Sequence, residues 1–131
     1  GSQLLHVLSG GRLHQHVGLH RVDLNPDYGY VSHKVRLVNS GRLSAIMPSE
    51  IMVNSRHHQV IDHATMHPSM ALSAIDEDGS VEAIESIQHS WAVGVQWHPE
   101  RADEVPSYHK KIFEAFAFAS KRFHQQKIHS I

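Results

Sequence analysis

The chain has 131 residues, of which 12 are Lys or Arg and 13 are Asp or Glu, so its formal net charge is −1 when the histidines are neutral. This length suits one domain with a core of ordinary size, and the balanced charge gives no reason to expect nucleic acid or an anionic membrane as a partner. No apolar run is long enough to span a bilayer and no signal-peptide pattern opens the chain, so we expect a cytoplasmic protein. The absence of cysteine excludes disulfides and thiolate-bound metals.

The N-terminal part of the sequence predicts one short helix followed by irregular chain. Residues 3–8 are mostly apolar and are followed by Gly10 and Gly11, which predicts a short buried helix with glycines at its C-terminal cap. Residues 12–23 show no period and are expected to be irregular, and residues 25–30 have the composition of a turn. Because the helical pattern begins at once, without a capping segment, we expect the chain to start at an artificial or processed edge of a larger domain.

The next segments predict short strands. Residues 33–38 alternate polar and apolar side chains, which is typical of a half-exposed strand. Residues 39–41 have turn composition, so residues 42–47 could pair back as a second strand. Residues 48–50 could open one short helical turn before the apolar residues 51–53.

The C-terminal half predicts a hairpin, a buried strand and a long helix. Residues 70–75 and 80–84 flank an Asp-Gly turn at 76–79, which is a strong hairpin signal. Residues 91–95 read as a buried strand. Residues 107–123 follow Pro106 and predict a helix, whose polar tail at 124–131 we expect to fray. Its apolar residues recur at helical spacing and are expected to pack in the core: Tyr108, Ile112, Ala115, Phe116, Ala119 and Phe123. Strands with a terminal amphipathic helix indicate the α/β class.

Two polar segments carry the chemistry. His98 and Glu100 follow the strand at 91–95, and a histidine with a carboxylate nearby is the base-plus-orienter half of a nucleophilic triad. Between two apolar runs, the segment 54–59 gathers an unusual set of hydrogen-bonding groups: Asn54, Ser55, Arg56, His57, His58 and Gln59. The sequence supplies no nucleophilic cysteine to complete the triad.

These segments resemble the class I glutamine amidotransferase-like superfamily, and within it the gamma-glutamyl-gamma-aminobutyrate hydrolase group with its gamma-glutamyl hydrolase relatives. The resemblance is carried by residues 1–5 with Gly10 and Gly11, 53–59, 78–85 and 94–100. It implies that residues 1–131 form one N-terminally incomplete domain, the C-terminal part of a flavodoxin-like α/β fold with a mostly parallel sheet, a β-hairpin and a terminal amphipathic helix.

The resemblance also implies a Cys-His-Glu triad that hydrolyses gamma-glutamyl amides. His98 and Glu100 match the second and third triad members, and the family places the cysteine two residues before the glycine matched by Gly1. The resemblance makes the gamma-glutamyl pocket a second group of site residues: Gln3, Ser55, His57, His58 and Gln59. It implies no cofactor. The chain alone is then expected to be inactive, because the missing N-terminal segment or a second chain must supply the nucleophile.

Alternatives stay open. The chain could be the glutaminase part of an amidotransferase that delivers ammonia to a synthase, or a non-catalytic remnant of the fold. His14, His16 and His20 could share a strand face, but nothing nearby supplies a matched second pair, so no metal site is expected. Glu82 and Glu85 are expected to be surface carboxylates without chemistry. A domain cut beside its nucleophile would expose core surface and a sheet edge, which favours aggregation, a completing second chain or a homo-oligomer.

Overall fold

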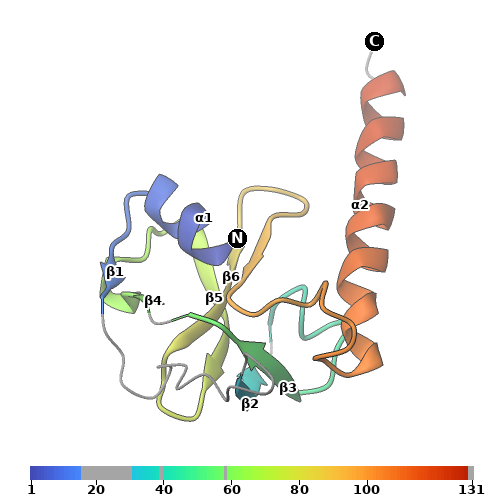
Figure 1. Cartoon of the computed structure of the whole chain (residues 1–131). Coiled ribbons are helices and arrows are strands. Elements are labelled where there is room, and N and C mark those ends of the chain that lie inside the picture. The colour runs from blue at the N-terminus through green and yellow to red at the C-terminus, as the bar shows by residue number, and fades with distance from the viewer. Residues whose placement is uncertain (16–30, 39, 58, 130–131) are drawn as a thin grey trace.

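A computed structural model describes residues 1–15, 31–38, 40–57 and 59–129. One sheet forms the body of this part of the chain, with a short helix against it and a long helix that extends away from it (Figure 1). The helices are α1 (Ser2–Leu8) and α2 (Lys110–His129), with 3-10 turns η1 (His63–Thr65) and η2 (Ser107–His109). The strands are β1 (Leu13–His14), β2 (Val31–Leu37), β3 (Glu50–Ser55), β4 (Val60–Ile61), β5 (Met70–Asp76), β6 (Val81–Ser86) and β7 (Val93–Val95).

The sheet has the order β1-β4-β6-β5-β2-β3, and β7 also pairs with β6. Every strand pairing among the described residues is antiparallel, so the expectation of a mostly parallel sheet is wrong for this part of the chain. Parallel neighbours require a crossover of a dozen or more residues, usually a helix. Here β5, β6 and β7 follow one another through short connections, which can join only antiparallel strands. The α/β class itself is confirmed.

The hairpin at the Asp-Gly turn is also confirmed. β5 pairs with β6, and Gly79 has a φ of 86°, a conformation that side-chain-bearing residues rarely adopt. The Asp76 carboxylate accepts hydrogen bonds at 3.0 Å from the backbone N–H groups of Asp78 and Ser80. These bonds explain how the turn forms locally, from its own side chains.

Two local predictions between β2 and β3 are wrong. Residues 42–47 form turns instead of a strand, with the Met47 N–H bonded to the Leu43 carbonyl, because this turn buries both side chains in the core. Residues 48–50 do not open a helix: β3 already begins at Glu50, where its register with β2 is set. The strand predicted over residues 33–38 is confirmed as β2. Within the irregular segment predicted over residues 12–23, Leu13 and His14 form β1; residues 16–30, including the predicted turn, lie outside the described residues.

Helix α1 confirms the predicted N-terminal helix, but the face that it buries carries polar side chains instead of the apolar ones. Ser2 and His6, four residues apart, are fully buried, whereas Leu4 and Leu8 are 65% and 77% exposed. Residues four apart lie on one helix face, so the polar pair faces the sheet and the leucine pair faces outward. Gly10 ends the helix with a φ of 93°, as the glycine cap predicts.

The main core lies between the sheet, the 43–47 turns and the start of α2. Its buried residues are Val35, Leu37, Leu43, Met47, Ile51, Val53, Ala74, Ala83, Trp97 and Ile112. Helix α2 contributes only its first turn: Ile112 is buried, but Phe116 and Phe123 are 56% and 52% exposed. The predicted core stripe is therefore wrong beyond Ile112, because α2 leaves the sheet (Figure 1). The helix also continues to His129, so the predicted fraying of residues 124–129 is not seen.

In the part of the chain that the structure describes, no helix has the length and apolar character needed to cross a bilayer.

His109 anchors η2 to the sheet. Its ring is buried, and its Nε2–H donates to the Met52 carbonyl at 2.8 Å. Burial lowers the pKa of His109, although the bond to Met52 opposes this shift.

The stability of the fold should therefore fall in mild acid. The pKa of a histidine in the unfolded chain is about 6.5, and the pKa of His109 in the folded protein is lower. Just below about pH 6.5 the unfolded state therefore binds more protons than the folded state. The contribution of His109 is complete above about pH 6.5 and is lost as the pH falls towards the folded pKa. Urea unfolding at pH 7.5 and pH 5.5 measures the loss. We expect a smaller loss in His109→Gln, whereas the exposed-site control His124→Gln should behave like the unaltered protein.

Candidate active site

His98 lies in the loop after β7, where its backbone is fixed by a buried amide. The Asn54 side chain accepts from the His98 N–H at 2.8 Å and donates to the His98 carbonyl at 3.1 Å. Asn54 is fully buried on β3, so a rigid strand holds the loop. Sequence reasoning assigned Asn54 only to a polar loop; its two-sided bond to the backbone of His98 depends on the fold.

The side chains of His98 and Glu100 are brought together as predicted. His98 Nδ1 lies 2.7 Å from Glu100 Oε1. Since an ionised carboxylate only accepts, Nδ1 carries the proton and Nε2 keeps its lone pair for a substrate proton. Burial raises the pKa of Glu100, but the bond from His98, backbone bonding and nearby positive charge lower it more, and the net pKa lies below the usual value. The pair is thus an oriented base with an ionised partner.

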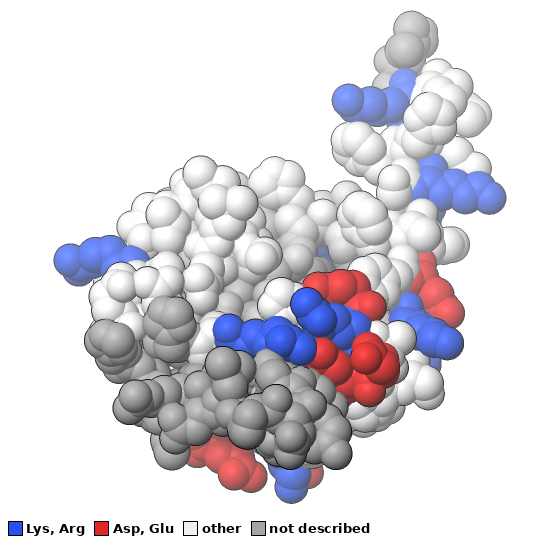
Figure 2. Space-filling view, in the orientation of Figure 1, with Lys and Arg blue, Asp and Glu red and all other residues white. Residues whose placement is uncertain are grey.

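A network of ion pairs and hydrogen bonds around Glu104 also holds Asn54, the residue that fixes the His98 loop. The Asn54 amide donates to the Glu104 carboxylate at 2.7 Å, and Arg56 and Arg101 form ion pairs with that carboxylate. Burial raises the pKa of Glu104. The bonds from Arg56 and Asn54 and the charges of Arg56 and Arg101 lower this pKa by more, so it lies below its usual value. On the face of the molecule drawn in Figure 2, acidic and basic side chains lie side by side, without a large patch of one sign.

The start of α1 packs directly against the strand that leads to His98. A Cβ atom on Gly94 would lie 2.7 Å from the Cα of Ser2, closer than real contacts allow. Glycine is therefore required at this position by the close approach of the α1 backbone. The approach places the first residues of the chain beside β7.

Gln96 connects three segments at this point. Its Oε1 accepts from the Ser2 hydroxyl at 3.0 Å, and its amide nitrogen donates to the Gln59 carbonyl at 2.8 Å and lies 3.0 Å from His57 Nδ1. Gln3 also donates to the Gln59 carbonyl, at 3.0 Å. We call this group, the side chains of Ser2, Gln3, His57 and Gln96 with the backbone carbonyl of Gln59, the glutamine clamp. No sequence pattern pointed to Gln96, because its role comes from contacts far apart in the chain.

The predicted pocket residues do not all share one environment. Gln3, His57 and Gln59 meet in the glutamine clamp, and the Gln59 amide also donates to Gln15. Ser55 is 2% exposed on β3, and its hydroxyl has no hydrogen-bond partner among the described residues, so it takes no part in the bonds of the glutamine clamp. His58 lies outside the described residues.

Glu82 and Glu85 are buried, so the expectation of surface carboxylates is wrong. Both lie on β6, which pairs with β4, β5 and β7 and is buried at every position. The sequence pattern could have indicated this, because Val81, Ala83 and Ile84 form an apolar run around Glu82. A central strand has no solvent face on which to place these carboxylates.

The Glu85 carboxylate is the acceptor at the centre of a second polar network. It accepts from the backbone N–H groups of Arg42 and Leu43 at 2.7 and 3.1 Å, and from the Ser73 hydroxyl at 2.5 Å. Arg42 Nη1 lies 3.3 Å from it. Gly41 belongs to the same arrangement, since a Cβ atom there would lie 2.7 Å from the carboxylate. Glu85 therefore fixes the turn that replaces the predicted strand.

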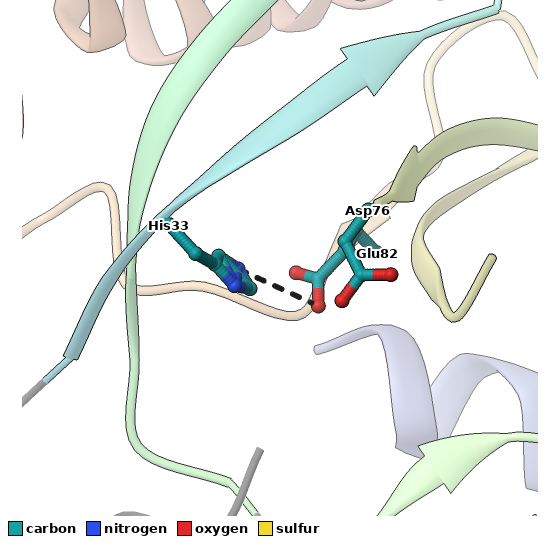
Figure 3. A group of neighbouring side chains, drawn as sticks. All are labelled: His33, Asp76 and Glu82. Atoms are coloured by element: carbon teal, nitrogen blue, oxygen red, sulfur yellow. Dashed lines mark ion pairs between the residues drawn. The ribbon is translucent and has the colours of Figure 1, made fainter. Parts of the chain in front are cut away.

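The Glu82 carboxylate lies behind the glutamine clamp. Its Oε1 is 3.5 Å from His57 Nε2 and 3.8 Å from His33 Nε2. Asp76 lies beside it, and Figure 3 shows the side chains of His33, Asp76 and Glu82 directed toward one another. Burial, reinforced by Asp78 and by the charge of Glu82, raises the pKa of Asp76 to about 7.

Comparison with known proteins supports the resemblance. The sequence model of the peptidase C26 family matches residues 1–100. Gamma-glutamyl-gamma-aminobutyrate hydrolase PuuD of Escherichia coli (strain K12) is 36% identical over 138 residues, which cover 97% of this chain and 54% of that protein. The chain thus spans about half the length of the curated relatives it matches.

Solved structures show the same fold. A putative GMP synthase component from Thermoplasma acidophilum superposes with a TM-score of 0.70 at 21% identity, over 97% of this chain and 57% of the other. A glutamine amidotransferase from Thermotoga maritima gives a TM-score of 0.55 at 19% identity, over 98% and 47%. At these identities the likeness concerns the fold alone.

Proposed function

The chain belongs to the peptidase C26 family, and from this membership we propose that the whole protein hydrolyses gamma-glutamyl amide bonds with a Cys-His-Glu triad. His98 is the base and Glu100 its orienting carboxylate; the cysteine lies outside this chain. A cytoplasmic location is part of the same proposal. The observation that carries it is the 2.7 Å contact between His98 Nδ1 and Glu100, on a loop held by Asn54. This contact leaves the basic Nε2 of His98 as the atom that receives a proton.

The proposed reaction has two steps. His98 Nε2 takes the thiol proton, and the thiolate attacks the gamma-carbonyl carbon of the substrate. Collapse of the tetrahedral oxyanion breaks the C–N bond, and the imidazolium returns its proton to the leaving amine. His98 then takes a proton from water, which attacks the thioester carbonyl; the C–S bond breaks, glutamate leaves, and the imidazolium returns its proton to the cysteine thiolate. Glu100 stabilises the imidazolium that forms in each step.

The start of α1 fits this scheme. The proposed cysteine would come two residues before Gly1, and a Cβ atom on Gly1 would lie 3.6 Å from the Val95 carbonyl of β7. Gln3, His57 and Gln59, joined in the glutamine clamp, are proposed to line the gamma-glutamyl pocket together with His58 and Ser55. The name of the curated relative from Escherichia coli agrees with a gamma-glutamyl-gamma-aminobutyrate substrate.

Release of the free amine from gamma-glutamyl-gamma-aminobutyrate by the purified whole protein tests the proposal. We expect turnover without any added protein. Strict dependence on a synthase partner, with ammonia released only from glutamine, would instead identify an amidotransferase. A protein that cleaves neither substrate would be the non-catalytic form of the fold.

Loss of the Gln96 amide should lower activity more than stability. Gln96→Ala removes the bonds that join α1 to the Gln59 segment, so the reacting groups lose their alignment. Because small misplacements of reacting groups cost about 10²-fold in rate, we expect kcat/KM to fall roughly 10- to 100-fold. Steady-state kinetics measure the effect. Gln88→Ala, at an exposed glutamine, is the control and should leave kcat/KM unchanged; an equal effect of both changes would contradict the role of the clamp.

A further inference from the structure

The cluster behind the glutamine clamp combines one imidazole and two carboxylates. His33 comes from β2, Asp76 from the end of β5 and Glu82 from β6 (Figure 3). Asp76 lies opposite Val35 in the sheet, and His33 is two residues before Val35 on the same strand. The side chains of His33 and Asp76 therefore lie on the same face of the sheet. One ligand atom from each of the three residues lies within 4.8 Å of the others.

This donor set suits a divalent transition-metal ion. Imidazole nitrogen and carboxylate oxygen are ligands of zinc, which binds them at about 2.0–2.2 Å in a tetrahedral arrangement. Tetrahedral ligands at that radius lie roughly 3.3 Å apart. His33 Nε2 and Glu82 Oε1 are 3.8 Å apart, so small side-chain rotations would bring them to that separation.

Electrostatics favours a cation at the same point. Glu82 is fully buried and Asp76 is partly buried, and two neighbouring carboxylates are costly to ionise together away from water. A dication between them would offset both charges. The His33 side chain is 22% exposed, so the cluster reaches solvent on that side.

His57 provides support outside the three ligands. Its Nδ1 lies 3.0 Å from both the Gln96 amide nitrogen and the Gln59 carbonyl, and its Nε2 lies 3.5 Å from Glu82 Oε1. The cluster is thus connected to the candidate active site through one imidazole.

We propose that His33, Asp76 and Glu82 bind one Zn²⁺ ion per chain. The proposal is separate from the hydrolase function, since the triad chemistry uses none of these three residues. It differs from the expectation of no metal site, which considered the histidines at positions 14, 16 and 20. The donors lie instead on strands that only the fold brings together.

Zinc titration of the whole protein, followed by calorimetry and by metal analysis after desalting, tests the site. We expect one equivalent that binds with a Kd of about 10 μM or tighter and raises Tm. Glu82→Gln and His33→Gln should each weaken this equivalent at least tenfold. The controls Glu114→Gln and His124→Gln change exposed residues of α2 and should retain it.

Two results would overturn the proposal. The first is a protein that binds no zinc equivalent at 100 μM free Zn²⁺; the second is a tight equivalent that survives both substitutions, which would place it on other histidines. If Glu82→Gln does not fold, crystals of the unaltered protein soaked in Zn²⁺ decide the matter. An anomalous peak between His33, Asp76 and Glu82 supports the site, and a peak elsewhere or none refutes it.

Discussion

Replacing His98 by alanine in the whole protein is expected to lower kcat for gamma-glutamyl amide hydrolysis by about 10³-fold or more. Without the imidazole, nothing takes the thiol proton or returns it to the leaving amine. The fold should be unaffected, because the His98 side chain is 44% exposed and Asn54 bonds only to its backbone. Amine release under saturating substrate measures kcat, and circular dichroism checks the fold.

The companion change, Glu100→Gln, separates the two roles of the pair. An amide oxygen still accepts from His98 Nδ1 but does not stabilise the imidazolium, so we expect a smaller loss, roughly 10- to 100-fold. Equal losses in the two variants would argue that Glu100 does more than orient the base. Activity retained in His98→Ala would refute the triad assignment altogether.

The largest effect on stability is expected at Glu85. Glu85→Leu removes the acceptor for two backbone N–H groups and the Ser73 hydroxyl, at a residue that is 2% exposed. It also leaves the Arg42 guanidinium without this partner carboxylate. Breaking one side of a buried, hydrogen-bonded ion pair costs about 3–5 kcal/mol. Urea unfolding should show a decrease of this size in the free energy of unfolding.

The matched control is Glu77→Leu, in the exposed turn of the same hairpin. Surface substitutions of this kind usually change stability by less than about 0.5 kcal/mol. Similar losses in both variants would mean that the Glu85 network contributes little and that the turn at 41–47 is held by its buried leucine and methionine alone.

The sequence predicted those features that depend on local chemistry. The Asp-Gly hairpin forms from its own turn residues, and the His98–Glu100 contact spans only two positions. The proposed roles of His98, Glu100 and the pocket residues stay predictions until activity is measured. The resemblance also identified the fold, because its four motifs extend over most of the chain.

Features set by long-range packing could not be read in this way. Periodicity indicated that α2 is amphipathic, but not that its path leaves Phe116 and Phe123 outside the core. The burial of Glu82 was indicated in part by the apolar residues around it, but the contacts of Glu85 with Arg42, Leu43 and Ser73 depend on long-range packing. The strand directions failed for a similar reason: a parallel sheet was inferred from the whole family domain, whereas these strands pair antiparallel.

The hydrogen bond between Ser2 and Gln96 joins residues 94 positions apart in the chain. Closing so long a loop is entropically costly, and contacts of high sequence separation form slowly. During synthesis, the hairpin of β5 and β6 can form early, but α1 must wait for β7 to leave the ribosome before it finds its place. The geometry around His98 is therefore expected to be one of the last parts of this chain to assemble.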